Sequence, residues 1–238
     1  MAQQRRSSRI PETKGQRPTL VERWDEQMRL IDLGLEKLTE TLMQMSNISV
    51  RAIELAAEAF MKGIDVSKKV YELSLQLKDL HEVVTDIATE LIARYQPLAT
   101  DLRYIKSCYE ISYGFYRFGR YAYDIADIIR EFGDISYCGM TEVRYTVELV
   151  KKLVNESIAS FKEKDPEKAK RVIELDDEVD AQYRNYLRKA ISYATTDKKC
   201  DLAVLLLMRY LERIGDHATY IAETVLYITG KATSEKPS

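Results

Sequence analysis

The chain contains few of the residues that interrupt helices. Its 238 residues include only nine glycines and five prolines, which fall mostly between long stretches of helical periodicity. Turn-rich β folds place such residues at short, regular intervals. Hydrophobic residues still make up 45% of the chain, which is enough apolar material for a core. The composition favours an all-helical globular protein over a β fold.

Cysteines and long apolar runs are also scarce. The three cysteines, Cys108, Cys138 and Cys200, are far apart and show no CxxC spacing. We therefore expect neither a disulfide framework nor a thiolate zinc site. A reducing cytoplasm is the expected compartment. The longest strongly apolar run, Leu202–Met208, is too short to cross a bilayer, and no secretory segment opens the chain. These absences predict a cytoplasmic protein that reaches a membrane only through a partner.

The charges of the chain nearly balance. The formal net charge is −2, which gives no electrostatic argument for nucleic-acid binding. Residues 1–19 differ, because they are basic and interrupted by proline and glycine. We predict a disordered tail there, with a docking arm for an acidic partner or phosphate head groups as the alternative. Residues 231–238 are predicted to be a loose C-terminus.

Helical periodicity divides the rest of the chain into two sets of three segments. Glycines and prolines separate the segments, and Asp65, Asp165 and either Thr196 or Asp197 stand where helices begin, as capping residues do. We expect helices over about 20–61, 65–95 and 97–133 in a first unit spanning 20–133, and over about 140–164, 165–193 and 197–230 in a second unit spanning 134–230. Pro97 is expected in the first turn of the third helix.

The two sets align with each other. Val70-Tyr71-Glu72-Leu73 matches Val172-Ile173-Glu174-Leu175 at an offset of 102 residues. The segment 116–122 matches 212–218 at an offset of 96, with arginine, glycine and alanine at shared positions. We interpret this as an internal duplication, which predicts an all-α fold of two tandem three-helix bundles.

Four carboxylates in the second unit are spaced to converge. Asp176 and Asp180 are four residues apart, as are Glu212 and Asp216, so each pair lies on one helix face about 6 Å apart. The members of each pair follow positions of the apolar stripe, and a short loop makes the two helices antiparallel neighbours. Such oxygen ligands suit Mg²⁺, Ca²⁺, Mn²⁺ or iron. The alternative is a solvated acidic edge with arginine counter-ions from Arg184, Arg188 and Arg213.

Catalytic motifs are absent or incomplete. The chain has no GxGxxG, P-loop or GxSxG motif, so nucleotide binding and acyl transfer lack support. His81-Glu82 lacks the second histidine of HExxH, and neither histidine completes an ExxH pair of the di-iron bundles. A metal-dependent hydrolase or oxidase at the carboxylates remains the enzymatic alternative, with His217 as its acid or base.

Three motifs carry a resemblance to a known family. The segment 209–218, with the sequence RYLERIGDHA, is followed by Ile221-Ala222-Glu223 and resembles the second-repeat motif of PhoU-like phosphate-uptake regulators. The segments VIELDDEVD at 172–180 and QPLATDLR at 96–103 resemble two other helices of that family. The resemblance covers roughly residues 20–230. It implies a metal ion or small cluster, iron first and Mg, Mn, Ca or Zn as alternatives, bound by Asp176, Asp180, Glu212 and Asp216.

The resemblance also implies a function. It points to a non-catalytic adaptor, in the form of a homodimer, that negatively regulates phosphate transport or phosphate signalling. Its partners would be the ATPase subunit of a phosphate transporter, a sensor kinase, or both. An accessory role for a different phosphate carrier is the alternative with the same fold.

The first unit departs from the family pattern. By the two offsets, the four carboxylates correspond to Ser74, Lys78, Tyr116 and Arg120, none of which is acidic. Because a fixed cation excludes metal by charge and by volume, we predict metal in the second unit only. Lys78 and Arg120 would instead form an anion-tolerant or structural patch, or simply face solvent.

Overall fold

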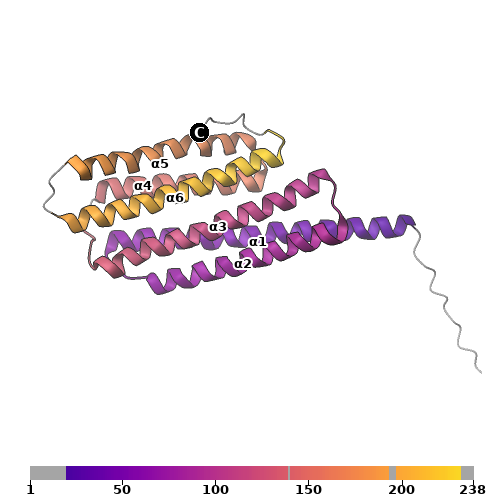
Figure 1. Cartoon of the computed structure of the whole chain (residues 1–238), viewed down its shortest axis with the longest axis horizontal. Helices are drawn as coiled ribbons and strands as arrows, with labels where there is room; N and C mark the ends of the chain where they lie inside the picture. The colour runs from indigo at the N-terminus through magenta and orange to yellow at the C-terminus, as the bar shows by residue number, and fades with distance from the viewer. Residues whose placement is uncertain (1–19, 139, 193–196, 232–238) are drawn as a thin grey trace, which may run out of the picture.

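The computed structural model describes residues 20–138, 140–192 and 197–231, which contain six helices and no strand (Figure 1). The first bundle consists of α1 (Leu20–Lys62), α2 (Ser67–Tyr95) and α3 (Ala99–Phe132). The second consists of α4 (Met140–Glu163), α5 (Pro166–Ser192) and α6 (Lys198–Ile228). The predicted all-α fold of two tandem three-helix bundles is confirmed. The predicted basic tail, the predicted C-terminal segment beyond 231, and Thr196 lie outside the described residues.

Aspartate side chains accept first-turn N–H groups at the start of three helices, although the N-cap position of α2 is Val66, one residue after Asp65. The Oδ1 atoms of Asp65 and Asp165 accept backbone N–H groups from Ser67 and Glu167, both at 2.8 Å. Asp197 accepts the N–H of Cys200 at 3.1 Å. These carboxylates satisfy donors that have no partner within the first turn of a helix. The prediction for Pro97 was wrong, because α3 begins only at Ala99 and the proline precedes the helix.

Helices α3 and α6 form the seam between the bundles. Helix α3 packs on α1, α2 and α6, while α6 packs on α3, α4 and α5, and α1 also touches α4. Figure 1 shows α3 and α6 lying next to each other across the middle of the molecule. The apolar stripe of α6 lies in the hydrophobic core of the molecule. Its buried members are Leu207, Leu211, Ile214, Ala218, Ile221 and Val225.

Equivalent glycines show the duplication in the packing itself. A methyl carbon added at Gly215 of α6 would lie 2.6 Å from Asp176 Oδ1 on α5. A methyl carbon at Gly119 of α3 would lie 3.3 Å from the Cα of Ser74 on α2, and 2.4 Å from a methyl carbon of Leu77. Gly119 and Ser74 are the residues that the offsets of 96 and 102 pair with Gly215 and Asp176. Each unit therefore uses a glycine to bring the same two helices together.

The structure corrects the expectation for cysteine. Cys138 and Cys200 form a disulfide across a sequence separation of 62 residues, and Cys108 is a buried free thiol. The disulfide joins the loop after α3 to the first turn of α6, where Lys199 Nζ also donates to the backbone oxygen of Asp134 at 3.1 Å. The prediction failed because spacing along the chain does not reveal that these segments meet. The cysteines consequently no longer support a reducing compartment.

Membrane crossing was not expected from the sequence. Within the described ranges, none of the helices combines the length and the hydrophobicity that crossing a bilayer requires.

Candidate functional site: an acidic cluster between α5 and α6

Three of the predicted ligands lie together. Ligand oxygens of Asp180 on α5 and of Glu212 and Asp216 on α6 lie within 4.8 Å of one another. The Glu212 side chain is 12% exposed, and those of Asp180 and Asp216 are each 32% exposed. The i, i+4 spacing places both α6 carboxylates on one face, and α5 presents Asp180 to that face. The convergence expected from spacing is present for these three residues.

Asp176 lies beside the cluster, one turn earlier on α5. Its Oδ1 atom is buried without a hydrogen-bond partner and faces the backbone of Gly215. Burial, followed by the charges of Asp180 and Asp216, raises the pKa of Asp176 to about 7. The Thr219 hydroxyl opposes this rise in pKa, and a positive neighbour would favour the ionised form further.

The pKa values of two other carboxylates of the cluster are also raised. Burial is the first cause that raises the pKa values of Glu212 and Asp216. Repulsion by neighbouring carboxylates raises both pKa values further. Each has an arginine on its own helix, since Arg209 approaches Glu212 at 2.6 Å and Arg213 approaches Asp216 at 3.0 Å. The cluster is thus acidic inside and edged by cations.

Arginine also reaches the third member. Arg184 lies 2.9 Å from Asp180 on the same helix. Two of the counter-ions named from the sequence, Arg184 and Arg213, therefore do pair with the cluster, and Arg209 is a third that the sequence analysis missed. All three pairs join residues three or four apart on one helix, where surface ion pairs contribute little to stability.

The donor set fits a hard cation. The buried Oδ1 of Asp176 and the buried Oε2 of Glu212 both lack a hydrogen-bond partner. Carboxylate oxygens are the preferred ligands of Mg²⁺, Ca²⁺ and Mn²⁺ and also bind iron. A cation held by Asp176, Asp180, Glu212 and Asp216 would supply the missing partners and reduce the mutual repulsion of the carboxylates.

The corresponding face of the first unit is built differently. Lys78 pairs with Glu82 at 3.7 Å, and Arg120 pairs with Asp124 at 3.2 Å, each on its own helix. The ring of Tyr116 stacks on His81 with the centroids 5.9 Å apart. Among the described residues, the α5–α6 cluster is the only group of three or more such ligands that lie close enough to hold one ion. Lys78 and Arg120 thus form ion pairs with acidic residues of their own helices. That the first unit binds no metal stays a prediction.

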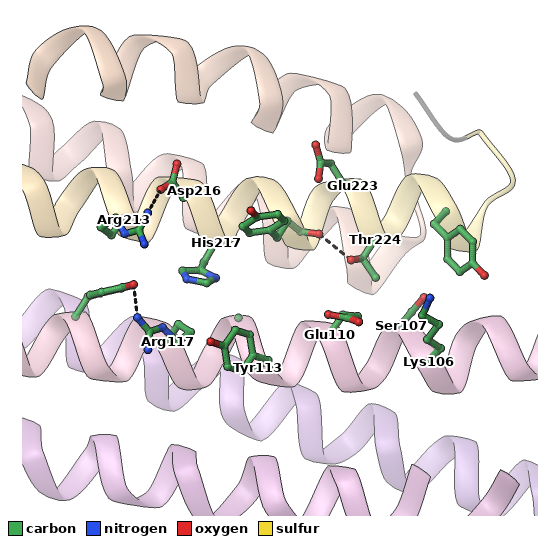
Figure 2. A pocket seen from close by; sticks show the side chains of 14 residues that line it. Lys106, Ser107, Glu110, Tyr113, Arg117, Arg213, Asp216, His217, Glu223 and Thr224 are labelled. Atoms are coloured by element: carbon green, nitrogen blue, oxygen red, sulfur yellow. Dashed lines mark hydrogen bonds and ion pairs between the residues drawn. The ribbon is translucent and has the colours of Figure 1, made fainter. Parts of the chain in front are cut away.

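A cavity of about 570 Å³ adjoins the cluster, between α3 and α6 (Figure 2). Asp216 belongs to the cluster and also lines the cavity, whereas Glu223 of the same helix lines the cavity without joining the cluster. This cavity could not be predicted from local sequence patterns, because its walls come from two helices nearly a hundred residues apart. The sequence signal that could have indicated the cavity is the presence of arginine and tyrosine on both lining helices.

His217, the acid or base of the enzymatic alternative, lies in this cavity. Its ring packs against Tyr113, Tyr121 and Tyr220 with centroid distances of 5.7–5.9 Å. Burial, and then the charges of Arg117 and Arg213, lowers the pKa of His217 to about 4. The imidazole is therefore neutral at neutral pH and is part of the seam between the bundles.

The fold and the site define a class of protein: a duplicated three-helix bundle with E/D-x-x-x-D carboxylate pairs on adjacent helices. The family described as "PhoU domain" matches residues 42–129 and again 146–225, so both units are covered. The chain belongs to the PhoU family.

Named relatives support this assignment. A phosphate-specific transport system accessory protein PhoU homolog of Pseudomonas aeruginosa is 31% identical over 201 residues, covering 82% of this chain and 83% of the relative. A homolog of the same description from Aquifex aeolicus is 31% identical over 202 residues, covering 82% and 90%. The chain is accordingly a homologue of accessory proteins of phosphate transport.

Solved structures agree on the fold. The crystal structure of PhoU from Pseudomonas aeruginosa superposes with a TM-score of 0.79 at 29% identity, covering 84% of this chain and 98% of that chain. The phosphate transport system regulatory protein PhoU from Streptococcus pneumoniae superposes with a TM-score of 0.78 at 17% identity, covering 86% and 100%.

Proposed function

We propose that the protein is a non-catalytic negative regulator of phosphate transport or phosphate signalling. The observation that carries this proposal is the match of the PhoU family to both units, together with relatives named as phosphate-transport accessory proteins. Fold alone does not define a function, but a family match over both units restricts it. The neutral, tyrosine-packed His217 supports a role without catalysis, because no other histidine adjoins the carboxylates.

The proposal includes partners and a location. The protein would act in the cytoplasm, as a homodimer, on the ATPase subunit of a phosphate transporter or on a sensor kinase. Its relatives are described as accessory to a phosphate-specific transport system, which is the support for a transporter partner. The alternative of a different phosphate carrier would change the partner and leave the rest of the proposal intact.

The proposal assigns a metal to the second unit. Asp176, Asp180, Glu212 and Asp216 would hold one ion or a small cluster, with iron first and Mg, Mn, Ca or Zn as alternatives. The two buried carboxylate oxygens without hydrogen-bond partners support it. The metal would hold α5 and α6 together and neutralise the surface that they present.

Elemental analysis of the purified protein tests the metal. We expect bound metal in the native protein, and its loss in Glu212→Gln and Asp216→Asn, because each change removes an anionic ligand. The double variant Lys78→Ala with Arg120→Ala is the matched control in the first unit and should keep the native metal content. Full retention in both carboxylate variants would contradict the assignment.

Phosphate uptake tests the regulation. In a bacterial host that lacks its own PhoU protein, expression of this chain is expected to lower the uptake of labelled phosphate. Co-purification with the ATPase subunit would identify the partner. Unchanged uptake despite stable expression and demonstrated binding to the transporter would count against negative regulation. Metal-dependent turnover of a phosphoester, lost in Asp216→Asn, would instead favour the enzymatic alternative.

A further inference from the structure

One end of the cavity between α3 and α6 carries two guanidinium groups. Arg117 donates from Nη2 to the hydroxyl of Tyr121, and its Nε is buried without a hydrogen-bond partner. Arg213 lies opposite, on α6, and pairs with Asp216 (Figure 2). Among the described residues no carboxylate lies within ion-pair distance of Arg117. Among the residues that line this end, the two positive charges of Arg117 and Arg213 face the one negative charge of Asp216.

Arg117 is held in a fixed orientation. Its guanidinium lies 4.7 Å from the ring centroid of Tyr121 and 6.0 Å from that of Tyr113, which are cation–π distances. A planar guanidinium has five N–H donors, and an oriented fork suits a phosphate or carboxylate. Most of these donors are unused here, so the arrangement is suited to binding an anion.

Aromatic rings line the middle of the cavity. Tyr113 on α3 and Tyr220 on α6 flank the ring of His217, at centroid distances of 5.9 and 5.7 Å. Tyr220 is 60% exposed, so its ring is available to a ligand. Such rings stack on flat ligands such as nucleobases.

The other end of the cavity offers hydrogen-bond acceptors. Glu110 on α3 lines this end, and Ser107, a residue that is 1% exposed, has a buried hydroxyl without a hydrogen-bond partner. Glu223 on α6 also lines the cavity, but Figure 2 shows its carboxylate on the side of α6 that faces away from α3. Seven residues separate Glu110 from Arg117, which is about 10 Å along a helix. Lys106 adds a cation beside Tyr227 at this end, 5.7 Å from its ring centroid.

We propose that this cavity binds a nucleoside phosphate, with the phosphate at Arg117, the base among the tyrosines and its amino or hydroxyl donors at Glu110. Its volume of about 570 Å³ lies within the range of small-molecule sites. The missing P-loop and GxGxxG motifs argue against backbone phosphate loops only, since here side chains of two long helices supply every group. This binding site does not depend on the proposed regulation of transport.

Calorimetric titration of the full chain with AMP, ADP and GMP tests the site. A chelator is included, so that a metal at Asp216 cannot bridge to the phosphate. We expect one nucleotide per chain, with adenosine and inorganic phosphate each bound at least about 10-fold more weakly, because each lacks one half of the ligand.

Two variants with matched controls locate the binding. Arg117→Ala is expected to weaken nucleotide binding about 10-fold or more, the factor for a lost charge-assisted hydrogen bond. Arg103→Ala, an exposed arginine of α3 outside the cavity, should leave it unchanged. Tyr220→Ala removes an exposed ring without disturbing the core and should also weaken binding, whereas Tyr71→Ala on α2 should not.

Each result of these titrations either supports or overturns the nucleotide site. Native binding together with weakening in Arg117→Ala and Tyr220→Ala, in variants that melt at the native temperature, supports the site. No binding of any of the three nucleotides at millimolar concentration would overturn it, as would equal binding by native protein and Tyr220→Ala. Phosphate bound as tightly as nucleotide would overturn the role of the aromatic rings. None of these outcomes bears on phosphate uptake.

Discussion

The two units of this protein pack their helices alike and differ in what lies on the packed faces. In the second unit, Gly215 lets a carboxylate of α5 approach α6, and three further carboxylates surround that contact. In the first unit, Gly119 allows the same approach by Ser74 and Leu77, and the surrounding positions hold a lysine, a tyrosine and an arginine. A duplicated fold can thus keep its backbone packing while the chemistry of one copy changes.

The units also differ in covalent linkage. The Cys138–Cys200 disulfide ties the start of α6 to the loop that enters the second unit. The position of Cys200 corresponds, at the offset of 96, to Tyr104 in the first unit, whose hydroxyl pairs with Thr39 Oγ1 at 2.6 Å. One unit therefore has a covalent link where the other has a hydrogen bond, which gives the largest expected difference in stability.

Removing the disulfide should have the largest effect. The double variant Cys138→Ser with Cys200→Ser is expected to lose about 2–4 kcal/mol of unfolding free energy, the usual contribution of a link that closes a long loop. Denaturant unfolding measures the loss, and hydrogen exchange should rise in α4–α6 more than in α1–α3. Cys108→Ala tests the buried thiol as a control. Identical stability of oxidised and reduced native protein would show that the disulfide does not contribute.

Replacing Gly119 or Gly215 by alanine should separate effects on helix packing from effects on metal binding. Gly119→Ala is expected to cost about 1–3 kcal/mol from overpacking against Leu77 and the Ser74 backbone. Because alanine gains roughly 1 kcal/mol in helix propensity, the expected net loss of unfolding free energy is up to about 2 kcal/mol. Gly215→Ala should cost less stability, because the added methyl meets the movable end of Asp176.

Metal affinity should show the opposite order. Gly215→Ala displaces Asp176 and should weaken metal binding, whereas Gly119→Ala should leave it unchanged. Thermal unfolding and metal titration of the same preparations measure both quantities. A loss of affinity in Gly119→Ala alone would contradict the assignment of the metal to the second unit.

The two units should also differ in how their stability depends on pH. The pKa of Asp176 is raised to about 7, by burial first and by Asp180 second, so the folded chain holds a proton that the unfolded chain releases near pH 4. In metal-free protein this group therefore makes stability fall as the pH rises from about 4 to about 7. Asp176→Asn should flatten that part of the profile, while Ser74→Ala, its counterpart, should not. Parallel profiles for native protein and Asp176→Asn would contradict the shift.

The sequence was sufficient for the fold and for much of the acidic cluster because both depend on local periodicity. Spacing of four places two carboxylates on one face of a helix, and a short loop fixes the neighbouring helix. Asp176 lies just outside the tightest group because side-chain direction, which spacing does not give, decides where each oxygen ends. The start of α3 was misjudged for a similar reason, since Pro97 is compatible with positions before a helix as well as inside its first turn.

Six helices, their duplication and the difference between the two units follow from the order of residues alone. The difference sets four carboxylates of the second unit against Ser74, Lys78, Tyr116 and Arg120 of the first. These features are written in residue type and spacing, which act over one or two helical turns. Three other features depend on how the helices pack: Cys138 bonds to Cys200, arginines lie at the edge of the acidic cluster, and Arg117 and Arg213 line one cavity. Such contacts join residues far apart in the chain or depend on rotamers, and both are set by the packing of the whole molecule.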